Sequence, residues 1–172
     1  MEQFISTIRQ IRLKVDICMN SVKLLTPSRE VSSTFTALQL TKSWLGEMLK
    51  NCGTENPYPK STDATSPVIE KQAEHSKDTF IDVNQEDCKE IFTSGDQTAR
   101  VKFFRFIMDG IIHDIESLLF QIPHTNFGNL ISTQSQQKIT LATVNAWQYA
   151  INSKIWLGWE LNSIREKQIA QS

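Results

Sequence analysis

Apolar residues recur at alternating spacings of three and four in the first fifty residues. In residues 1–25 this stripe consists of Met1, Phe4, Ile8, Ile11, Val15, Cys18, Val22 and Leu25. Such spacing buries one face of an amphipathic helix against neighbouring helices. A Thr-Pro-Ser turn at 26–28 favours a new helix start, and the next stripe comprises Val31, Phe35, Leu38, Leu45 and Leu49. A turn this short predicts an antiparallel helical hairpin over residues 1–50.

The same apolar pattern returns near the C-terminus of the sequence. Its stripe consists of Val101, Phe104, Met108, Ile111, Ile115, Leu118 and Ile122. A turn at 123–134 then leads to a last helix, which we expect over about 138–167. Residues 98–172 therefore predict a second hairpin, packed on the first to form one compact unit.

The segment between the hairpins, residues 51–97, has a different character. It begins with Gly, Asn, Ser, Thr and three of the five prolines, and continues in an acidic run from Glu70 to Glu90. No helical period is sustained there, so we predict a long extended connection with a short helix near 86–92. The predicted fold class is all-α, with two tandem antiparallel hairpins packed as a bundle.

One octet occurs twice. The sequence KSWLGEML at 42–49 and the sequence KIWLGWEL at 154–161 share Lys, Trp, Leu, Gly and the final Leu at an offset of 112. The stripes of the two preceding helices align at an offset of 100, and the longer turn at 123–134 accounts for the difference. Together these matches predict an internal duplication of the hairpin.

The lysine of each octet interrupts an apolar stripe. Counting along the stripes places a core position at Lys42 in the first copy and at Lys154 in the second. In one interpretation, each side-chain stem lies along the core edge while the ammonium group reaches water. In the other, both ammonium groups point into a shared polar pocket that holds an anion such as a phosphate.

The octet tryptophans and glycines also admit two interpretations. Trp44 and Trp156 either fill gaps between helices or form a wall on which a base stacks. Gly46 and Gly158 weaken a helix interior by nearly 1 kcal/mol relative to alanine. Their equivalent positions therefore indicate a close approach, by a neighbouring helix in the first instance and by a ligand in the alternative.

Composition and charge narrow the classes of function. The net charge of −1 disfavours broad electrostatic binding to a nucleic acid polymer or a membrane. Charged residues interrupt both the N-terminal segment and the apolar run at 101–122, so neither a signal peptide nor a membrane span is expected. Three cysteines without CxxC spacing favour a reducing compartment and argue against disulfides or a zinc site.

Catalytic signatures are missing from the sequence. The motifs GxGxxG, Walker A, HExxH and GxSxG do not occur. Asp109 and His113 have the spacing of a structural pair on one helix, whereas His75 and His124 fit no metal-ligand spacing. We therefore expect a protein that is not an enzyme and that needs no cofactor.

A resemblance gives the first hairpin a more specific interpretation. The stretch REVSSTFTALQLTKSWLG, residues 29–46, resembles the hairpin motif of phage proteins that sequester bacterial immune signals, the anti-CBASS sponges and their anti-Thoeris relatives. The sequence that follows, NPYPKSTDATSPVIE, is similar to the tail found after this hairpin in phage-encoded members. The matching positions are Arg29, Glu30, Ser32, Thr36, Leu38, Lys42, Trp44, Leu45 and Gly46. The chain departs from the small or acidic residues of the family at Thr34, Gln39, Leu40 and Thr41.

The resemblance implies a sponge that binds a cyclic nucleotide second messenger without cleaving it. Members of this family hold cyclic oligonucleotides or cyclic ADP-ribose derivatives between helices, usually in symmetric homo-oligomers, in the cytoplasm of the infected bacterium. It implies phosphate-binding roles for Arg29 and Lys42, and the internal repeat adds Lys154. Tyr58 and Tyr149 are further candidates, as aromatic residues with a polar tip near the expected hairpin ends.

Two other functions remain open from the sequence. A helical interaction module would bind or inhibit a host protein through its apolar seams and would need no small-molecule pocket at Lys42. An enzyme that acts on nucleotides is the third possibility, and it would convert the ligand where a sponge returns it intact.

Overall fold

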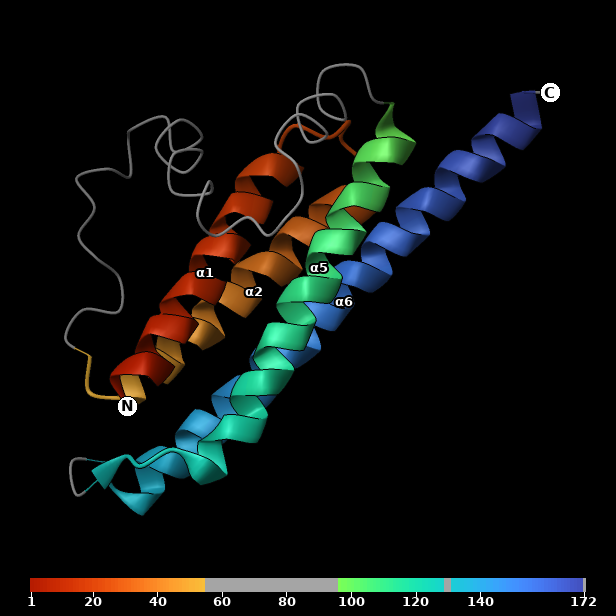
Figure 1. Cartoon of the computed structure of the whole chain (residues 1–172). Coiled ribbons are helices and arrows are strands. Elements are labelled where there is room, and N and C mark those ends of the chain that lie inside the picture. Colours follow the sequence, from red (N-terminus) through yellow and green to blue (C-terminus); the bar gives the residue numbers. More distant parts are fainter. Residues whose placement is uncertain (55–95, 129–130, 172) are drawn as a thin grey trace.

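Four long helices make up the described part of the chain (Figure 1). The computed structural model describes residues 1–54, 96–128 and 131–171. The helices are α1 (Glu2–Val22), α2 (Arg29–Asn51), α5 (Gln97–Gln121) and α6 (Thr133–Gln171), with a short 3₁₀ helix η2 (Ile122–His124) after α5. These described ranges contain no strand, which confirms the all-α prediction. Most of the predicted extended connection, and its short helix near 86–92, lie outside the described residues.

Side-chain caps fix where the helices begin. The Ser28 hydroxyl accepts a hydrogen bond from the Val31 N–H at 3.1 Å, and the Asp96 carboxylate accepts one from the Ala99 N–H at 2.9 Å. These contacts satisfy N–H groups that a first helical turn leaves without partners. The helix α6 begins at Thr133, earlier than predicted, because the Ser132 hydroxyl accepts from the Ser135 N–H at 3.1 Å. A polar first turn hides this start from a search for apolar periodicity.

The helices form two antiparallel hairpins that pack on each other. In Figure 1, α1 and α6 run in one direction, and α2 and α5 run in the opposite direction. The helix α2 packs chiefly on α6, while α1 contacts both α2 and α5. Since α2 and α5 point the same way, Asn51 and Gln97 lie at opposite ends of the bundle. This arrangement agrees with the predicted hairpins, although their duplication stays a prediction.

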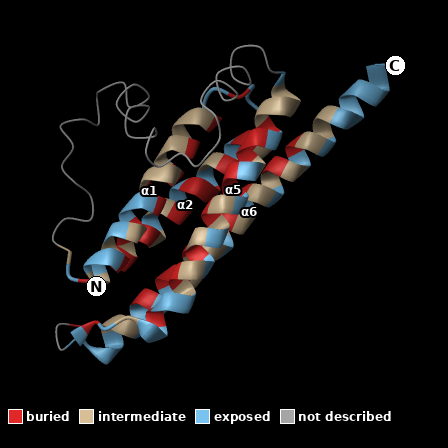
Figure 2. Ribbon diagram, in the orientation of Figure 1, coloured by how far each residue is buried: buried red, intermediate tan, exposed pale blue. Residues whose placement is uncertain are grey.

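The core coincides with the predicted stripes. Every residue of the stripe from Val101 to Ile122 is buried, and so are the members of the first stripe from Phe4 to Leu25 (Figure 2). Met1 and Phe35 are the stripe members of the first hairpin that are only partly buried. Apolar periodicity therefore identifies the buried faces of α1, α2 and α5.

Small side chains line the buried faces of α2 and α6. Residues of this kind that are at least nine-tenths buried are Thr34, Ala37, Thr41, Gly46, Ala142, Thr143, Ala146, Ala150 and Ser153. Their hydroxyls are satisfied within their own helices, since Thr41 donates to the Ala37 carbonyl at 2.9 Å and Thr143 donates to the Ile139 carbonyl at 2.7 Å. Small residues allow two helices to approach closely, which explains why these two helices share the most extensive contact in the bundle.

Candidate functional site

The two octet lysines are both paired with aspartates. The Lys42 ammonium lies 2.6 Å from an Asp16 carboxylate oxygen on α1, and Lys154 pairs with Asp109 on α5. The lysine side chains are 32% and 35% exposed, so each stem lies against the core while its charge stays at the surface. Each lysine is bound within its own hairpin. The structure does not bring Lys42 and Lys154 to one pocket.

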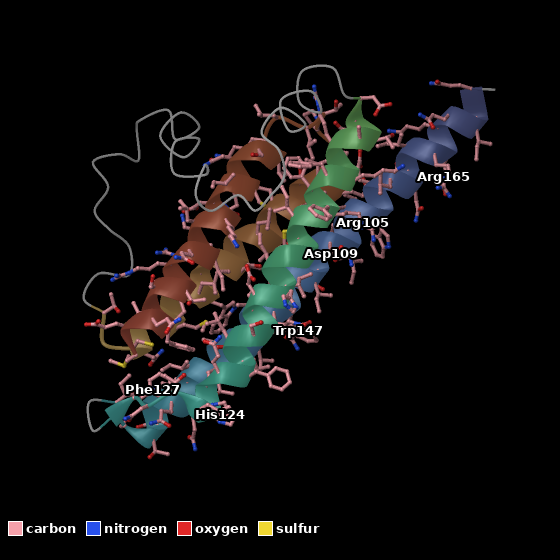
Figure 3. The ribbon with its side chains drawn as sticks, viewed as in Figure 1. Arg105, Asp109, His124, Phe127, Trp147 and Arg165 are labelled. Atoms are coloured by element: carbon pink, nitrogen blue, oxygen red, sulfur yellow. The ribbon has the colours of Figure 1, made fainter. Side chains whose placement is uncertain are left out.

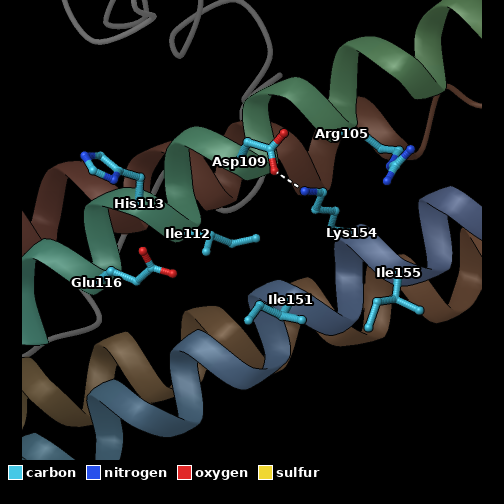
Figure 4. Close-up of a pocket in the computed structure, with 8 residues that line it drawn as sticks. All are labelled: Arg105, Asp109, Ile112, His113, Glu116, Ile151, Lys154 and Ile155. Atoms are coloured by element: carbon cyan, nitrogen blue, oxygen red, sulfur yellow. Dashed lines mark ion pairs between the residues drawn. The ribbon is translucent and has the colours of Figure 1, made fainter.

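A groove of about 510 Å³ runs between α5 and α6 (Figure 4). Its lining residues are Arg105, Asp109, Ile112, His113, Glu116, Ile151, Lys154 and Ile155. Two of them, Lys154 and Ile155, belong to the second octet. The octet therefore supplies one wall of the groove, and the polar stripe of α5 supplies the other.

Three contacts fix the antiparallel register of α5 and α6 along this groove. Lys154 pairs with Asp109, and the Trp147 indole N–H donates to Glu116 at 3.0 Å. At the other end, the Arg105 guanidinium lies next to Gly158. Its central carbon would be 3.7 Å from the Cβ of an alanine at that position. Both groove carboxylates are thus already engaged, by an ammonium group and by an indole.

Arg105 is the groove cation with unmet hydrogen-bonding capacity. Its Nε is buried and has no hydrogen-bond partner among the described residues. The guanidinium lies beside Gly158, where the missing side chain leaves room for it. Arg105 belongs to the neighbouring helix α5, as the sequence indicated, but its side chain lies at an ordinary contact distance from Gly158 and the backbones are not forced into close approach there.

Arg29 and Trp156 come together at the junction of the two hairpins. The Arg29 guanidinium lies 5.8 Å from the centre of the Trp156 ring, which in turn meets Trp159 edge-to-face at 4.8 Å. Arg29 is exposed. It is thirteen residues from Lys42 on the same helix, a separation of about 20 Å at 1.5 Å per residue. These two basic residues therefore cannot hold the same phosphate.

The remaining aromatic candidates are dispersed. Trp44 is partly buried and packs on the core, as the packing interpretation predicts. Tyr149 is partly buried on α6, and it is not among the residues that line the groove. Tyr58 lies outside the described residues, so its proposed role stays a prediction.

Histidines and metal ligands give no second site in the described ranges. Asp109 binds Lys154, so the predicted pairing of Asp109 with His113 is replaced by an ion pair across the groove. His124 is exposed in η2, and His75 lies outside the described residues. No group of three or more His, Cys, Asp or Glu side chains within the described ranges is placed to hold a metal ion.

A second, smaller hollow lies at the turn between α1 and α2. It measures about 340 Å³, and its lining residues are Val22, Lys23, Leu25, Pro27, Val31, Ser32, Phe35 and Thr36. Its one cation, Lys23, lies over the Phe35 ring at 5.3 Å from the centroid. This hollow is more apolar in its lining than the α5–α6 groove, and it offers an anion fewer donors.

Two buried thiols are chemically quiet. Burial raises the pKa of Cys18 to about 12. It raises the pKa of Cys52 to about 11, although the positive charge of the chain's N-terminus opposes the shift. Both thiols are therefore protonated near neutral pH, whereas a nucleophilic cysteine is a thiolate. Cys88 lies outside the described residues.

The sequence pointed to Lys154 but not to Arg105. In the sequence, Arg105 is one of the charged residues that interrupt the apolar run at 101–122. The available signal was the polar series Arg105, Asp109, His113 and Glu116, whose spacings of four, four and three place all four on one side of a helix. This side faces α6, and how α5 turns toward α6 within the second hairpin cannot be read from the spacing alone.

Comparisons with known proteins do not identify the chain. No protein-family model, no curated protein and no solved structure matches it. The resemblance of residues 29–46 to phage sponges therefore stays a prediction. Among the described helices, none is both long enough and apolar enough to cross a membrane.

Proposed function

We propose that this protein binds and sequesters a cyclic nucleotide second messenger of bacterial immunity without cleaving it. The proposal places it in the cytoplasm of an infected bacterium, as a homo-oligomeric phage sponge of the kind that residues 29–46 resemble. The observation that supports it best is the groove between α5 and α6, which two cations, Arg105 and Lys154, line together with three isoleucines.

The chemistry of the groove suits a ligand that carries both phosphates and bases. A guanidinium offers planar, paired donors that match phosphate oxygens. Ile112, Ile151 and Ile155 offer apolar area on which a base can lie. The volume of about 510 Å³ falls within the range of small-molecule sites.

The engagement of the groove carboxylates supports the proposal that the ligand is bound without conversion. Asp109 accepts from Lys154, and Glu116 accepts from the Trp147 indole. In these contacts neither carboxylate is positioned to activate a water molecule against a phosphate. The expected role of the groove residues is therefore to hold the ligand.

The test is isothermal titration calorimetry of the full chain against cyclic dinucleotides, cyclic trinucleotides and cyclic ADP-ribose isomers. We expect tight binding of at least one ligand and its recovery intact after the protein is denatured. Arg105→Ala should weaken that binding about 100-fold, at the upper end of a charge-assisted hydrogen bond. Arg165→Ala is the matched control, because Arg165 lies further along α6 toward the C-terminus and is not a lining residue (Figure 3).

Two outcomes would contradict this proposal. If no panel member binds, the sponge is excluded for these ligand classes. If a ligand binds but is recovered altered, the protein is an enzyme that acts on nucleotides. Equal losses in Arg105→Ala and Arg165→Ala would move the site away from the groove.

A helical module that binds or inhibits a host protein is the second candidate function. The observation that favours it is a set of exposed apolar side chains on the second hairpin, Phe106, Phe120, Ile155 and Trp159. The two candidates separate experimentally, since only this one predicts no response to the nucleotide panel and a stoichiometric complex with a host protein.

A further inference from the structure

The two ends of the α5–α6 groove carry opposite charges. The guanidinium group of Arg105 lies at one end, and the carboxylate of Glu116 lies at the other (Figure 4). Both side chains come from α5 and are eleven residues apart, which corresponds to about 16 Å along the helix axis. A molecule that fills the groove therefore meets a cation at one end and an anion at the other.

An apolar pair lies between the charged ends. Ile112 on α5 and Ile151 on α6 line the groove, and both are half-buried. Ile112 lies seven residues after Arg105 and four residues before Glu116, which corresponds to about 10 Å and about 6 Å along the axis. The antiparallel register sets Ile151 opposite Ile112, because the contact of Glu116 with Trp147 lies four residues away from each of them.

One carboxylate oxygen of Glu116 is available to a ligand. The Oε1 atom accepts the indole N–H of Trp147 at 3.0 Å. The Oε2 atom has no hydrogen-bond partner among the residues that the structure describes. Glu116 is exposed, so a molecule in the groove can reach this oxygen. Since a carboxylate only accepts hydrogen bonds, the ligand group that pairs with Oε2 must be a donor.

A nucleotide carries its chemical groups in the order that the groove presents. Its phosphates suit the cations Arg105 and Lys154. The flat ring of its base suits Ile112 and Ile151, and the polar edge of the base then faces Glu116. Adenine, guanine and cytosine bear an exocyclic amino group that donates hydrogen bonds, whereas uracil and hypoxanthine bear only carbonyl groups outside the ring.

We propose that Glu116 determines which base the groove accepts, and that it selects a base with an exocyclic amino group. The amino group donates to the Oε2 atom. A carbonyl oxygen in the same place would face a second acceptor, and this contact is repulsive. The inference rests on the proposed function, because Glu116 can select a base only if the groove binds a nucleotide. It adds the orientation of the ligand and the chemical class of its base.

The test is isothermal titration calorimetry with pairs of ligands that differ in an amino group. Cyclic di-AMP and cyclic di-GMP are each compared with cyclic di-IMP, whose hypoxanthine bases have no amino group. A third pair is cyclic ADP-ribose and its hypoxanthine analogue, cyclic IDP-ribose. In at least one pair, we expect the wild-type chain to bind the amino member about tenfold more tightly, at the lower end of a hydrogen bond to a charged group.

Glu116→Gln separates recognition of the base from packing. The amide oxygen of glutamine can still accept from the Trp147 indole, and its NH₂ group then replaces the free acceptor with a donor. The preference for the amino member should therefore be lost. Glu166→Gln is the matched control, since Glu166 is exposed on α6 and does not line the groove, and it should keep the wild-type preference.

Arg105→Ala tests the orientation of the ligand. If the phosphates lie at the Arg105 end, this variant should weaken both members of a pair by the same factor and leave the ratio of their dissociation constants unchanged. Glu116→Gln should change that ratio. Helix content by circular dichroism shows whether each variant is folded, and the wild-type ratio tests the inference even if a variant does not fold.

Three results would overturn the inference. These are a wild-type chain that binds both members of every pair equally, a preference that survives Glu116→Gln, and a preference that Arg105→Ala abolishes. If cyclic nucleotides bind regardless of their amino groups, only this inference fails and the proposed function stands. If no cyclic nucleotide binds, the proposed function fails as well.

Discussion

The lysine stems of the two octets lie at core-edge positions because four methylene groups can pack on apolar neighbours while the charge stays outside. Each ammonium group forms an ion pair with an aspartate of the neighbouring helix, Lys42 with Asp16 on α1 and Lys154 with Asp109 on α5. Exposed ion pairs contribute about 0–1 kcal/mol each, so these contacts select the helix register more than they stabilise the fold.

Gly158 gives a prediction at the residue scale. A Cβ added there would meet Arg105 at 3.7 Å, an ordinary contact distance, and alanine favours a helix interior by about 1 kcal/mol. Gly158→Ala should therefore raise the free energy of unfolding by up to about 1 kcal/mol, as measured by chemical denaturation.

Gly53→Ala is the control for this prediction. Gly53 has a φ of +80°, a conformation that costs a residue with a Cβ about 1–2 kcal/mol, so this variant should be less stable than wild type. A loss of stability in Gly158→Ala would instead show that the methyl group displaces the Arg105 guanidinium. The cost of that displacement would then exceed the gain in helix propensity.

The sequence predicts each half-buried lysine but not its partner. The phase of the apolar stripe is local information, so it places Lys42 and Lys154 at core edges from the chain alone. Which aspartate each lysine meets depends on the relative height of two helices. That height follows from packing between helices, and the paired residues are 26 positions (Asp16 and Lys42) and 45 positions (Asp109 and Lys154) apart in the sequence.

At the scale of the elements, Ser28 at the start of α2 has two structural roles. The Ser28 hydroxyl caps the helix by accepting from Val31, and it donates to Glu160 on α6 at 2.8 Å. Glu160 is only 6% exposed, so this bond satisfies part of a carboxylate that has little access to water. One serine therefore begins a helix and joins the two hairpins.

Replacing that serine tests both functions. Ser28→Ala should lower the free energy of unfolding by about 2–4 kcal/mol, which combines a lost cap with a buried carboxylate that loses its donor. Asp96→Ala is the matched control, because Asp96 caps α5 at an exposed site and should cost only about 1 kcal/mol. Equal losses in the two variants would show that the bond to Glu160 adds nothing.

The helices themselves are well predicted by the sequence, and their ends less so. Long apolar stripes predict α1, α2 and α5 and their buried faces, because a period of 3.6 residues repeats many times in each. The early start of α6 escaped prediction since its first turn is polar and its cap, Ser132, is one of several candidate residues. Helix ends depend on single hydrogen bonds, which periodicity does not detect.

At the scale of the whole molecule, the described residues form two hairpins held by contacts that cross between them. These include the ion pair of Lys14 with Asp114 at 3.0 Å, the bond of Ser28 to Glu160, and the packed small residues of α2 and α6. The interface between hairpins is thus built like the interface of an obligate dimer, with a buried apolar centre and polar contacts nearer its edge.

The two hairpins should therefore associate even when they are expressed as separate chains. We expect chains 1–54 and 96–172, co-expressed with a tag on only one of them, to co-purify as a one-to-one complex with the helix content of the intact protein. Lys14→Asp in the first fragment should weaken the complex by facing Asp114 with a like charge. Recovery of the tagged fragment alone would show that the covalent connection is needed for assembly.

The candidate groove lies within the second hairpin, between two helices, and this explains why it is only partly predictable from the sequence. Its two walls come from segments that the sequence treated separately, a polar stripe on α5 and an octet on α6. The repeated octet identifies Lys154 from the sequence. The position of Arg105 beside Gly158 is evident only in the structure.

The ion pair between Lys154 and Asp109 also affects what the groove can select. Asp109 is an internal competitor for the ammonium group, so a lone phosphate that displaces it exchanges one anion for another and gains little. A ligand gains binding free energy only if it makes a second contact, such as a further anionic group with Arg105 or an apolar ring with the isoleucines. Simple anions that are abundant in the cell should therefore bind the groove weakly. Molecules that contact the groove at several points should bind it more tightly.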